Sequence, residues 1–221
     1  MHIPLYIFDM DETLVDGDTS SLWIEYLISK GLCGQEVKTQ EQALMVDYAL
    51  GDLDLQAYMD LVVSPISHIP SSQVDSLVDD FVSQCVMPKV FPQAKDLIDA
   101  LLAAGVEIIV ISASATFIVQ SVVKRLGITH AIGVNTLVKD GFYTSKIVGV
   151  PSYREGKIAC LKHWIQSHHA DFDETHFYTD SINDLPLCEF ADFAYLINPR
   201  GQLAAVAATH PEWTTFNWQR Q

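Results

Sequence analysis

The sequence predicts an α/β protein with a doubly wound, mostly parallel sheet and an all-helical segment inserted after the first strand. Apolar runs with the length of buried strands alternate with amphipathic helical stripes over most of the 221 residues. This alternation is typical of a parallel sheet with helices on both faces. Residues 16–87 break the alternation and contain helical patterns only. Polar side chains follow several predicted strands, which is where such folds keep their chemistry.

The predicted strands are apolar runs bounded by turn residues. They cover residues 3–8, 106–111, 132–138, 176–179, 193–197 and, more weakly, 213–218. Asp140-Gly141, directly after the third run, is a strong hairpin signal. We therefore expect a small antiparallel flap beside the main sheet.

Helical stripes with apolar residues three or four positions apart separate most of these strands. They cover residues 92–104, 116–126 and 157–165. The inserted segment is expected to hold four more helices, at residues 20–29, 36–50, 55–63 and 72–85. Turn residues mark the breaks between them. We interpret residues 1–15 and 88–221 as the α/β core and residues 16–87 as a helical cap over the site.

The composition argues against several classes of partner. The chain has 13 Lys and Arg against 28 Asp and Glu, which gives a formal charge of −15. Nucleic acid is not an expected partner because phosphate backbones need clustered positive charge, and anionic membrane surfaces are disfavoured. Four scattered cysteines without a C-x-x-C pair favour reduced, buried thiols. Since the chain shows no signal-peptide pattern and no apolar run of membrane-spanning length, we expect a cytoplasmic protein of unpredicted oligomeric state.

Asp9 and Asp11 directly follow the first predicted strand. Side chains alternate along a strand, so residues two apart point the same way. Two carboxylates that converge on one small volume repel each other, and the pKa of one of them rises. A hard cation removes this repulsion. The pair therefore predicts a Mg²⁺ site at the carboxyl edge of the sheet.

Ser112 and Ser114 stand at the end of the second predicted strand, and the next helix is expected to begin near Ser114. Free main-chain N–H groups at a helix start, together with the helix dipole, form a phosphate cradle. For Ser114 we favour the simpler role of a helix N-cap. For Ser112, phosphate binding and capping fit this segment equally well.

Lys157 and two aspartates lie near two further helix starts. Lys157 falls in the first turn of a helix, where the dipole disfavours a cation unless an anion is nearby. An exposed surface lysine is the common alternative. Asp180 ends another strand, and Asp184 falls in the first turn after it and faces back toward Asp180. Helix capping by Asp180 or Ser181 is the alternative role there.

Together these segments resemble the four motifs of the haloacid dehalogenase superfamily of phosphohydrolases. The matching positions, in motif order, are Asp9-x-Asp11-x-Thr13, Ser112, Lys157 and Asp180-Ser181-x-Asn183-Asp184. Their order and spacing fit the family over residues 9–184. The helical insert lies between the first and second motifs, similar to the cap of the phosphoserine-phosphatase-like subgroup. The resemblance implies a Rossmann-like core with an inserted helical cap.

The resemblance also implies a Mg²⁺-dependent phosphatase that works through an aspartyl-phosphate. Asp9 would attack phosphorus. Asp11 would protonate the leaving alcohol and then deprotonate the attacking water. Ser112 and Lys157 would bind the phosphoryl oxygens and neutralise their charge.

The cofactor site follows from the same resemblance. Mg²⁺ would be held by Asp9, the main-chain carbonyl of Asp11, and Asp180. A second group of residues would support the metal, Lys157 or the site as a whole. This group consists of Thr13, Asn183 and Asp184.

The substrate prediction depends on a departure from the phosphoserine phosphatases, which hold the substrate carboxylate with a cap arginine and its amine with a glutamate. Asp18 stands at about the position of that glutamate, but the first arginine of the chain is Arg125. Residues 46–87 contain seven aspartates and no Lys or Arg. We therefore expect a small phosphorylated metabolite with a neutral or cationic head group. An amino-alcohol phosphate such as histidinol phosphate fits better than phosphoserine, although solvated helix faces explain most of the cap acids more simply.

The residues expected to contact this substrate come from the cap, from the end of the second strand and from the segment before the third motif. They are Asp18, Ser112, Ala113 and Arg154.

Three other functions use similar residues. A phosphotransferase would pass the phosphoryl group from the same intermediate to an alcohol. A receiver-like signalling domain also surrounds a phosphorylated aspartate with acids, a hydroxyl and a lysine, but it lacks the acid/base that Asp11 supplies and has no large cap. An inactive binding module is not favoured because every expected catalytic position is filled.

Overall fold

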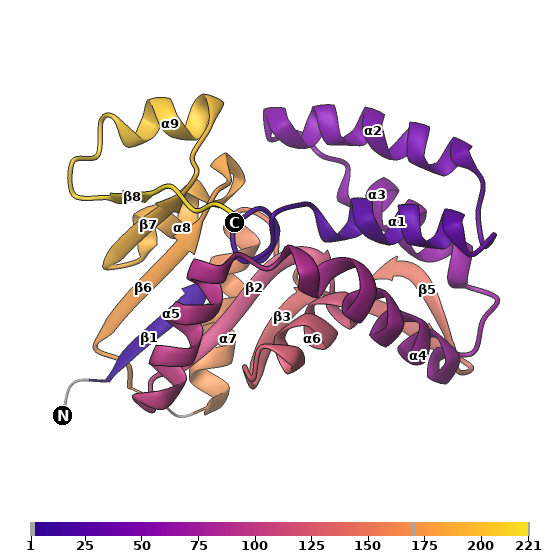
Figure 1. The fold of residues 1–221 in the computed structure, drawn as a ribbon, viewed down its shortest axis with the longest axis horizontal. Coiled ribbons are helices and arrows are strands. Elements are labelled where there is room, and N and C mark those ends of the chain that lie inside the picture. The colour runs from indigo at the N-terminus through magenta and orange to yellow at the C-terminus, as the bar shows by residue number, and fades with distance from the viewer. Residues whose placement is uncertain (1–2, 169–170, 221) are drawn as a thin grey trace.

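The computed structural model describes residues 3–168 and 171–220. Its main feature is a six-stranded sheet with the order β3-β2-β1-β6-β7-β8 (Figure 1). Each neighbouring pair of strands is parallel. The strands are β1 Pro4–Phe8, β2 Glu107–Ala115, β3 His130–Val134, β6 Glu174–Thr179, β7 Phe193–Ile197 and β8 Thr214–Phe216. The predicted doubly wound, mostly parallel sheet is confirmed.

The third predicted strand, residues 132–138, is in fact two strands. β3 ends at Val134, and the chain then enters a separate two-stranded sheet. Asn135 lies at the break. Its Oδ1 accepts a hydrogen bond from Thr116 Oγ1 (2.8 Å), and its main-chain oxygen accepts one from Val148 N (2.9 Å). These bonds turn the chain out of the main sheet.

The second sheet is the predicted antiparallel flap. It pairs β4 (Thr136–Lys139) with β5 (Phe142–Ile147). Asp140 and Gly141 connect the two strands, and their φ angles are +53° and +82°. Two positive φ angles in a row are what a two-residue hairpin turn of this kind requires, and Asp-Gly tolerates them. The flap also contacts the helical segment, because Ser71 N donates to Gly141 O (2.8 Å).

Helices cover both faces of the main sheet. α5 (Pro92–Ala103) and α6 (Thr116–Arg125) pack on the face that carries Phe8. The opposite face, which carries Ile7, packs against α7 (Glu155–His168), α8 (Leu185–Phe190) and α9 (Gly201–Ala207). The alternation of side chains along β1 therefore supplies both layers of the core. Full burial of one such side chain stabilises the fold by roughly 1.5–3 kcal/mol.

Apart from an isolated β-bridge between Pro70 and Phe142, the secondary structure described between Thr19 and Lys89 is helical, and it lies beside the carboxyl edge of the sheet (Figure 1). The elements are α1 Thr19–Ser29, α2 Gln35–Leu50, α3 Leu55–Val63, α4 Ser71–Phe81, the 3-10 turns Ser64–Ile66 and Met87–Lys89, and the π-helical turn Val82–Val86. Trp23 is at the centre of this segment: its Nε1 donates to Val62 O (3.1 Å), and its ring lies 5.1 Å from that of Phe81. This apolar cluster continues into the α5/α6 face. The division into a core and a cap at residues 16 and 87 therefore remains a proposal.

The stretch of chain that enters the helical segment and the stretch that leaves it lie side by side. Val15 pairs with Val90 in an antiparallel bridge, and Asp16 N donates to Lys89 O (2.8 Å). Arg220, near the C-terminus, reaches the same place, because its Nε lies 2.6 Å from Asp16 Oδ2. The helical segment thus enters and leaves through one paired connection.

Two expectations about the whole chain concern thiols and membranes. The four cysteines are free, but the expected burial holds for Cys188 alone, because the other three are half-buried. No helix in the described part of the chain is long and apolar enough to cross a membrane.

Candidate active site

Lys157 is the centre of a buried charge cluster at the carboxyl edge of the sheet. Its Nζ lies 2.8 Å from Asp9 Oδ1 and 2.7 and 2.8 Å from the two carboxylate oxygens of Asp184. Only 2% of Lys157 is exposed, so the surface-lysine alternative is wrong. Burial by itself lowers the pKa of Lys157, but Asp184 and Asp9 outweigh this effect and hold the pKa above its ordinary value. Lys157 is therefore a fixed cation beside the proposed nucleophile.

Thr13 links Asp9 to a second acid, Asp180. Its Oγ1 lies 3.5 Å from Asp9 Oδ2 and 3.2 Å from Asp180 Oδ1. Burial raises the pKa of Asp9 to about 7 against the opposing effect of Lys157. Burial, followed by the nearby charge of Asp9, also raises the pKa of Asp180. Carboxylates crowded in this way are stabilised in their charged form by additional positive charge.

The donor set at Asp9 and Asp180 fits a magnesium ion. Mg²⁺ prefers oxygen ligands, is usually bound through one or two carboxylates, and completes its coordination with water and substrate phosphate. In the described part of the chain, no three His, Cys, Asp or Glu side chains are grouped as a metal site. Asp9 and Asp180 supply the one or two carboxylates through which Mg²⁺ is usually bound. The predicted set of Asp9, the main-chain carbonyl of Asp11, and Asp180 matches that description and remains a proposal.

Asp11 is held by donors from the helical segment and from the sheet. Thr19 N, at the start of α1, donates to Asp11 Oδ1 (2.6 Å). Ser112 Oγ (3.1 Å) and Ser114 Oγ (2.8 Å), both on β2, donate to Asp11 Oδ2. Because both carboxylate oxygens accept hydrogen bonds, the orientation of the carboxylate is fixed.

The expectation that Ser114 is a helix N-cap is wrong. β2 continues to Ala115, and α6 begins at Thr116 without a side-chain cap hydrogen bond. The longer strand is supported by β3, because Val134 pairs with Ala115. Ser112 also lies within the strand, where its Oγ accepts a hydrogen bond from Ser114 N (3.0 Å). The role of Ser112 toward a phosphoryl group stays a prediction.

The fourth motif forms a tight turn after β6. Ser181 caps the 3-10 helix Ile182–Asp184 by accepting a hydrogen bond from Asn183 N (3.2 Å), so the expected capping occurs at Ser181. Asp184 Oδ2 also accepts from Thr179 Oγ1 (2.7 Å), which orients Asp184 toward Lys157. Asn183 reaches the helical segment, where its Nδ2 donates to the main-chain oxygen of Tyr48 (3.0 Å).

A small cavity lies between these residues and the helical segment. Its volume is about 20 Å³, which leaves room for about one water molecule. The residues that line it are Asp9, Asp11, Asp18, Met45, Tyr48, Leu53, Tyr58, Ala113 and Ser114. A phosphomonoester does not fit this cavity in the present arrangement of the helices.

Two of the residues predicted only as substrate contacts, Asp18 and Ala113, line this cavity. Asp18 is also the N-cap of α1, since its Oδ1 accepts from Ser21 N (2.6 Å), and Tyr58 OH donates to the same oxygen (3.3 Å). Burial raises the pKa of Asp18 to about 7. Arg154 does not line the cavity. It is exposed, and its Nη1 donates to Gly51 O (2.5 Å), which joins the core to the loop after α2.

The family is decided by a comparison with known protein families. The model of the haloacid dehalogenase-like hydrolases matches residues 6–189 of this sequence. The chain belongs to the haloacid dehalogenase-like hydrolases. The predicted superfamily and the hydrolase class are thereby confirmed, and the receiver-like signalling domain is excluded.

Relatives of this haloacid dehalogenase-like hydrolase include named phosphatases. A protein of Neisseria meningitidis serogroup C (strain 8013), named histidinol-phosphatase, is 32% identical over 97% of this chain and 99% of its own length. A structure from Bordetella pertussis Tohama I, described as a protein with unknown function, has a TM-score of 0.89 at 28% identity and covers 98% of this chain and 99% of its own. A phospho-aspartyl intermediate analogue of phosphoserine phosphatase has a TM-score of 0.69 at 18% identity, over 97% of this chain and 94% of its own, and shares the fold.

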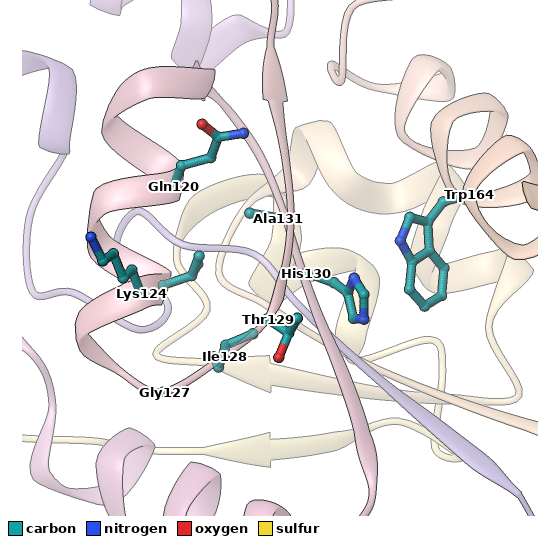
Figure 2. A pocket seen from close by; sticks show the side chains of 9 residues that line it. Gln120, Lys124, Gly127, Ile128, Thr129, His130, Ala131 and Trp164 are labelled. Atoms are coloured by element: carbon teal, nitrogen blue, oxygen red, sulfur yellow. The ribbon is translucent and has the colours of Figure 1, made fainter. Parts of the chain in front are cut away.

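A second pocket lies at the amino end of β3 (Figure 2), and its lining residues differ from those of the cavity described above. Its volume is about 500 Å³, and its wall includes Gln120 and Lys124 of α6, His130 of β3 and Trp164 of α7. His130 pairs with Glu107 (2.9 Å). None of the family motifs reaches this pocket, because they meet at the carboxyl ends of the strands.

Sequence reasoning missed the cap side chains that close the site. Tyr48 and Met45 lie on α2, and Tyr58 lies on α3. Tyr58 and Met45 also pack in the hydrophobic core, so neither side chain stands out in the sequence as part of a site. The sequence feature that comes nearest to predicting their position is the Gly51-Asp52 turn. It brings the end of α2 close to the start of α3.

Proposed function

We propose that the chain is a Mg²⁺-dependent phosphatase that hydrolyses a small phosphomonoester through an aspartyl-phosphate on Asp9. The observation that carries the proposal is the buried cluster in which Lys157 contacts Asp9 (2.8 Å) and Asp184 (2.7 Å). A nucleophilic carboxylate can approach an anionic phosphate only if fixed positive charge is present. One close pair of charges is worth ~4 kcal/mol at an intermediate dielectric. Lys157 supplies one such charge.

The reaction has two halves, and Asp11 takes part in both. Asp9 attacks phosphorus, the bond from phosphorus to the alcohol oxygen breaks, and Asp11 gives its proton to that oxygen. Water then attacks the phosphorus of the aspartyl-phosphate, and Asp11 takes up its proton as inorganic phosphate leaves. Ser112 and Lys157 donate hydrogen bonds to the phosphoryl oxygens during both halves. Mg²⁺, when bound by Asp9, Asp180 and the main-chain oxygen of Asp11, would supply further charge compensation.

The cavity lining supports an amino-alcohol phosphate as substrate. Asp18 is the charged residue that the helical segment contributes, and the others are Met45, Tyr48, Leu53 and Tyr58. No Lys or Arg lines the cavity from the described helices, so a substrate carboxylate would lack a partner. An ammonium or imidazolium group would pair with Asp18 and pack against tyrosine faces. The relative named histidinol-phosphatase supports the same choice.

A substrate screen with Mg²⁺ tests this proposal. We expect histidinol phosphate to be hydrolysed with a kcat/KM at least about tenfold above that for phosphoserine, because loss of one buried charge pair is worth more than ~1.4 kcal/mol. Asp9→Asn is expected to remove all turnover while circular dichroism stays unchanged. Preference for phosphoserine would refute the substrate class, and turnover by Asp9→Asn would refute the mechanism.

The phosphotransferase alternative shares the same intermediate. An assay that contains an acceptor alcohol and a radiolabelled substrate distinguishes the two reactions, because only a phosphotransferase forms labelled transfer product in quantity. A phosphatase is expected to release inorganic phosphate as its main product.

A further inference from the structure

Ser114 carries a buried hydroxyl to which the mechanism above gives no role. Only 3% of the residue is exposed. Its Oγ lies 2.8 Å from Asp11 Oδ2, 3.2 Å from Thr19 Oγ1 and 3.2 Å from Ser20 Oγ. Thr19 and Ser20 belong to the first turn of α1 and are fully buried. Ser114 therefore stands between Asp11 and the helical segment.

The direction of these hydrogen bonds follows from proton counting. A serine hydroxyl donates one proton and accepts up to two hydrogen bonds. Ser114 Oγ donates to Asp11 Oδ2, so the single hydroxyl proton of Ser114 is used in that bond. The hydroxyls of Thr19 and Ser20 must then donate to Ser114. Such a chain of donors orients and strengthens the last bond, which is the one to Asp11.

Ser114 also differs from the second donor to the same oxygen. Ser112 Oγ contacts Asp11 Oδ2 at 3.1 Å, but the proposed mechanism requires Ser112 to donate to a phosphoryl oxygen of the substrate. One hydroxyl proton cannot serve both. Once Ser112 turns to the substrate, Ser114 is the β2 hydroxyl that still holds Asp11 Oδ2.

We propose that Ser114 is a positioning residue for the acid/base Asp11, an inference that rests on the proposed phosphatase function. Ser114 acts through Asp11 and does not bind the phosphoryl group. Its hydroxyl keeps one carboxylate oxygen fixed while Thr19 N fixes the other at 2.6 Å. Proton transfer to the leaving alcohol depends on this placement.

The dependence of the rate on the leaving group distinguishes the positioning role of Ser114 from a purely structural role. An alkoxide is a strong base and needs a proton as its bond to phosphorus breaks, whereas p-nitrophenolate leaves without one. The ratio kcat/KM reports the steps up to release of the alcohol, so it isolates proton donation from hydrolysis of the intermediate. A poorly placed Asp11 therefore slows alkyl phosphates selectively.

The test measures kcat/KM of Ser114→Ala for histidinol phosphate and for p-nitrophenyl phosphate, with Mg²⁺ present. We expect the kcat/KM for the alkyl phosphate to fall by roughly 10- to 100-fold. This is less than the full contribution of acid–base catalysis, which is roughly 10²–10⁴-fold. The loss on the aryl phosphate is expected to stay below roughly threefold. Ser121→Ala is the matched control, because Ser121 is also buried and donates to a carboxylate, Asp79, at 2.8 Å. Both ratios are expected to be unchanged in that variant.

An equal loss on both substrates, or no loss on either, would overturn the role of Ser114. If Ser114→Ala does not fold by circular dichroism, Ser114→Cys keeps the volume with a weaker donor and is expected to show the same selectivity to a smaller degree. A parent protein that hydrolyses neither phosphate would instead refute the proposed function, and the inference with it.

Discussion

At the residue scale, Lys157 balances two buried carboxylates and thereby couples stability to chemistry. Breaking a buried ion pair by removing one partner leaves an uncompensated charge, which is far more costly than losing a surface pair. Asp9 and Asp184 would be left in that state without Lys157. We therefore expect Lys157 to be needed both for the stability of the fold and for the proposed reaction.

Lys157→Met is expected to abolish activity and to lower the free energy of unfolding at neutral pH by about 3–5 kcal/mol. The loss should shrink as the pH falls, because a protonated Asp9 no longer carries a charge. Urea unfolding at neutral and acidic pH measures both effects. Lys95→Met, which breaks the exposed pair with Asp99, serves as the control and should cost less than about 1 kcal/mol. Equal losses in the two variants would contradict a buried, paired Lys157.

Asp18 makes a second prediction, which concerns pH. Its folded-state pKa is raised from 3.8 to about 7 by burial and by Asp11. Between these values the folded chain keeps a proton that the unfolded chain has lost, so Asp18 lowers stability as the pH rises through this window. Asp18→Asn still caps α1 but cannot ionise. The variant should match the parent at acidic pH below this window and be more stable at alkaline pH above it.

Urea unfolding at the two pH values measures this difference. Asp54→Asn, at the exposed N-cap of α3, is the matched control and should show no gain at high pH. An Asp18→Asn variant that is no more stable than its parent at alkaline pH would show that Asp18 is not held in a desolvated site.

At the scale of elements, the close approach of β3 to the end of β2 positions the second motif. Gly133 makes this approach possible: a Cβ there would lie 2.7 Å from Thr116 Cα and 2.8 Å from Ser114 O. Both are main-chain atoms, which cannot rotate away. The glycine therefore fixes the strand segment that carries Ser112 and Ser114.

Gly133→Ala is expected to lower the free energy of unfolding by about 1–3 kcal/mol, as other overpacked sites do. The kcat/KM for an alkyl phosphate should fall with it, because the displaced segment holds Asp11. Gly34→Ala is the control, since its added Cβ meets only the flexible side-chain end of Glu36. Urea unfolding and steady-state kinetics measure both variants. A Gly133→Ala protein with parental stability and activity would contradict a tight β2–β3 contact.

The sequence predicted the residues that meet at the sheet edge because strand ends and helix starts leave local patterns. Asp9, Lys157 and Asp180 were found in this way. The end of β2 was not, because Ser112-Ala113-Ser114-Ala115 lacks the apolar pattern of a strand and is held as one by pairing with β3. The break at Asn135 likewise depends on a hydrogen bond to Thr116, a contact that no local pattern encodes.

At the scale of the whole molecule, the helical segment and the core form one closed site. Asn183 Nδ2 donates to Tyr48 O (3.0 Å), and Arg154 Nη1 donates to Gly51 O (2.5 Å), so the loop and the end of α2 are tied to the core. The cavity of about 20 Å³ is too small for a phosphomonoester. The proposed reaction therefore requires the helices to open for substrate entry and to close for chemistry, and closure would keep bulk water away from the proposed aspartyl-phosphate.

The central claim, that Asp9 is phosphorylated during turnover, is tested most directly by rapid quenching with a substrate labelled with phosphorus-32. With labelled p-nitrophenyl phosphate, whose alcohol leaves without a proton from Asp11, the Asp11→Asn variant should allow the intermediate to accumulate, because the base that activates water is missing. Peptide mapping of the acid-quenched protein is predicted to place the label on Asp9, and hydroxylamine, which cleaves acyl phosphates, should remove it. Label on another residue, or an active enzyme that never becomes labelled, would contradict the mechanism.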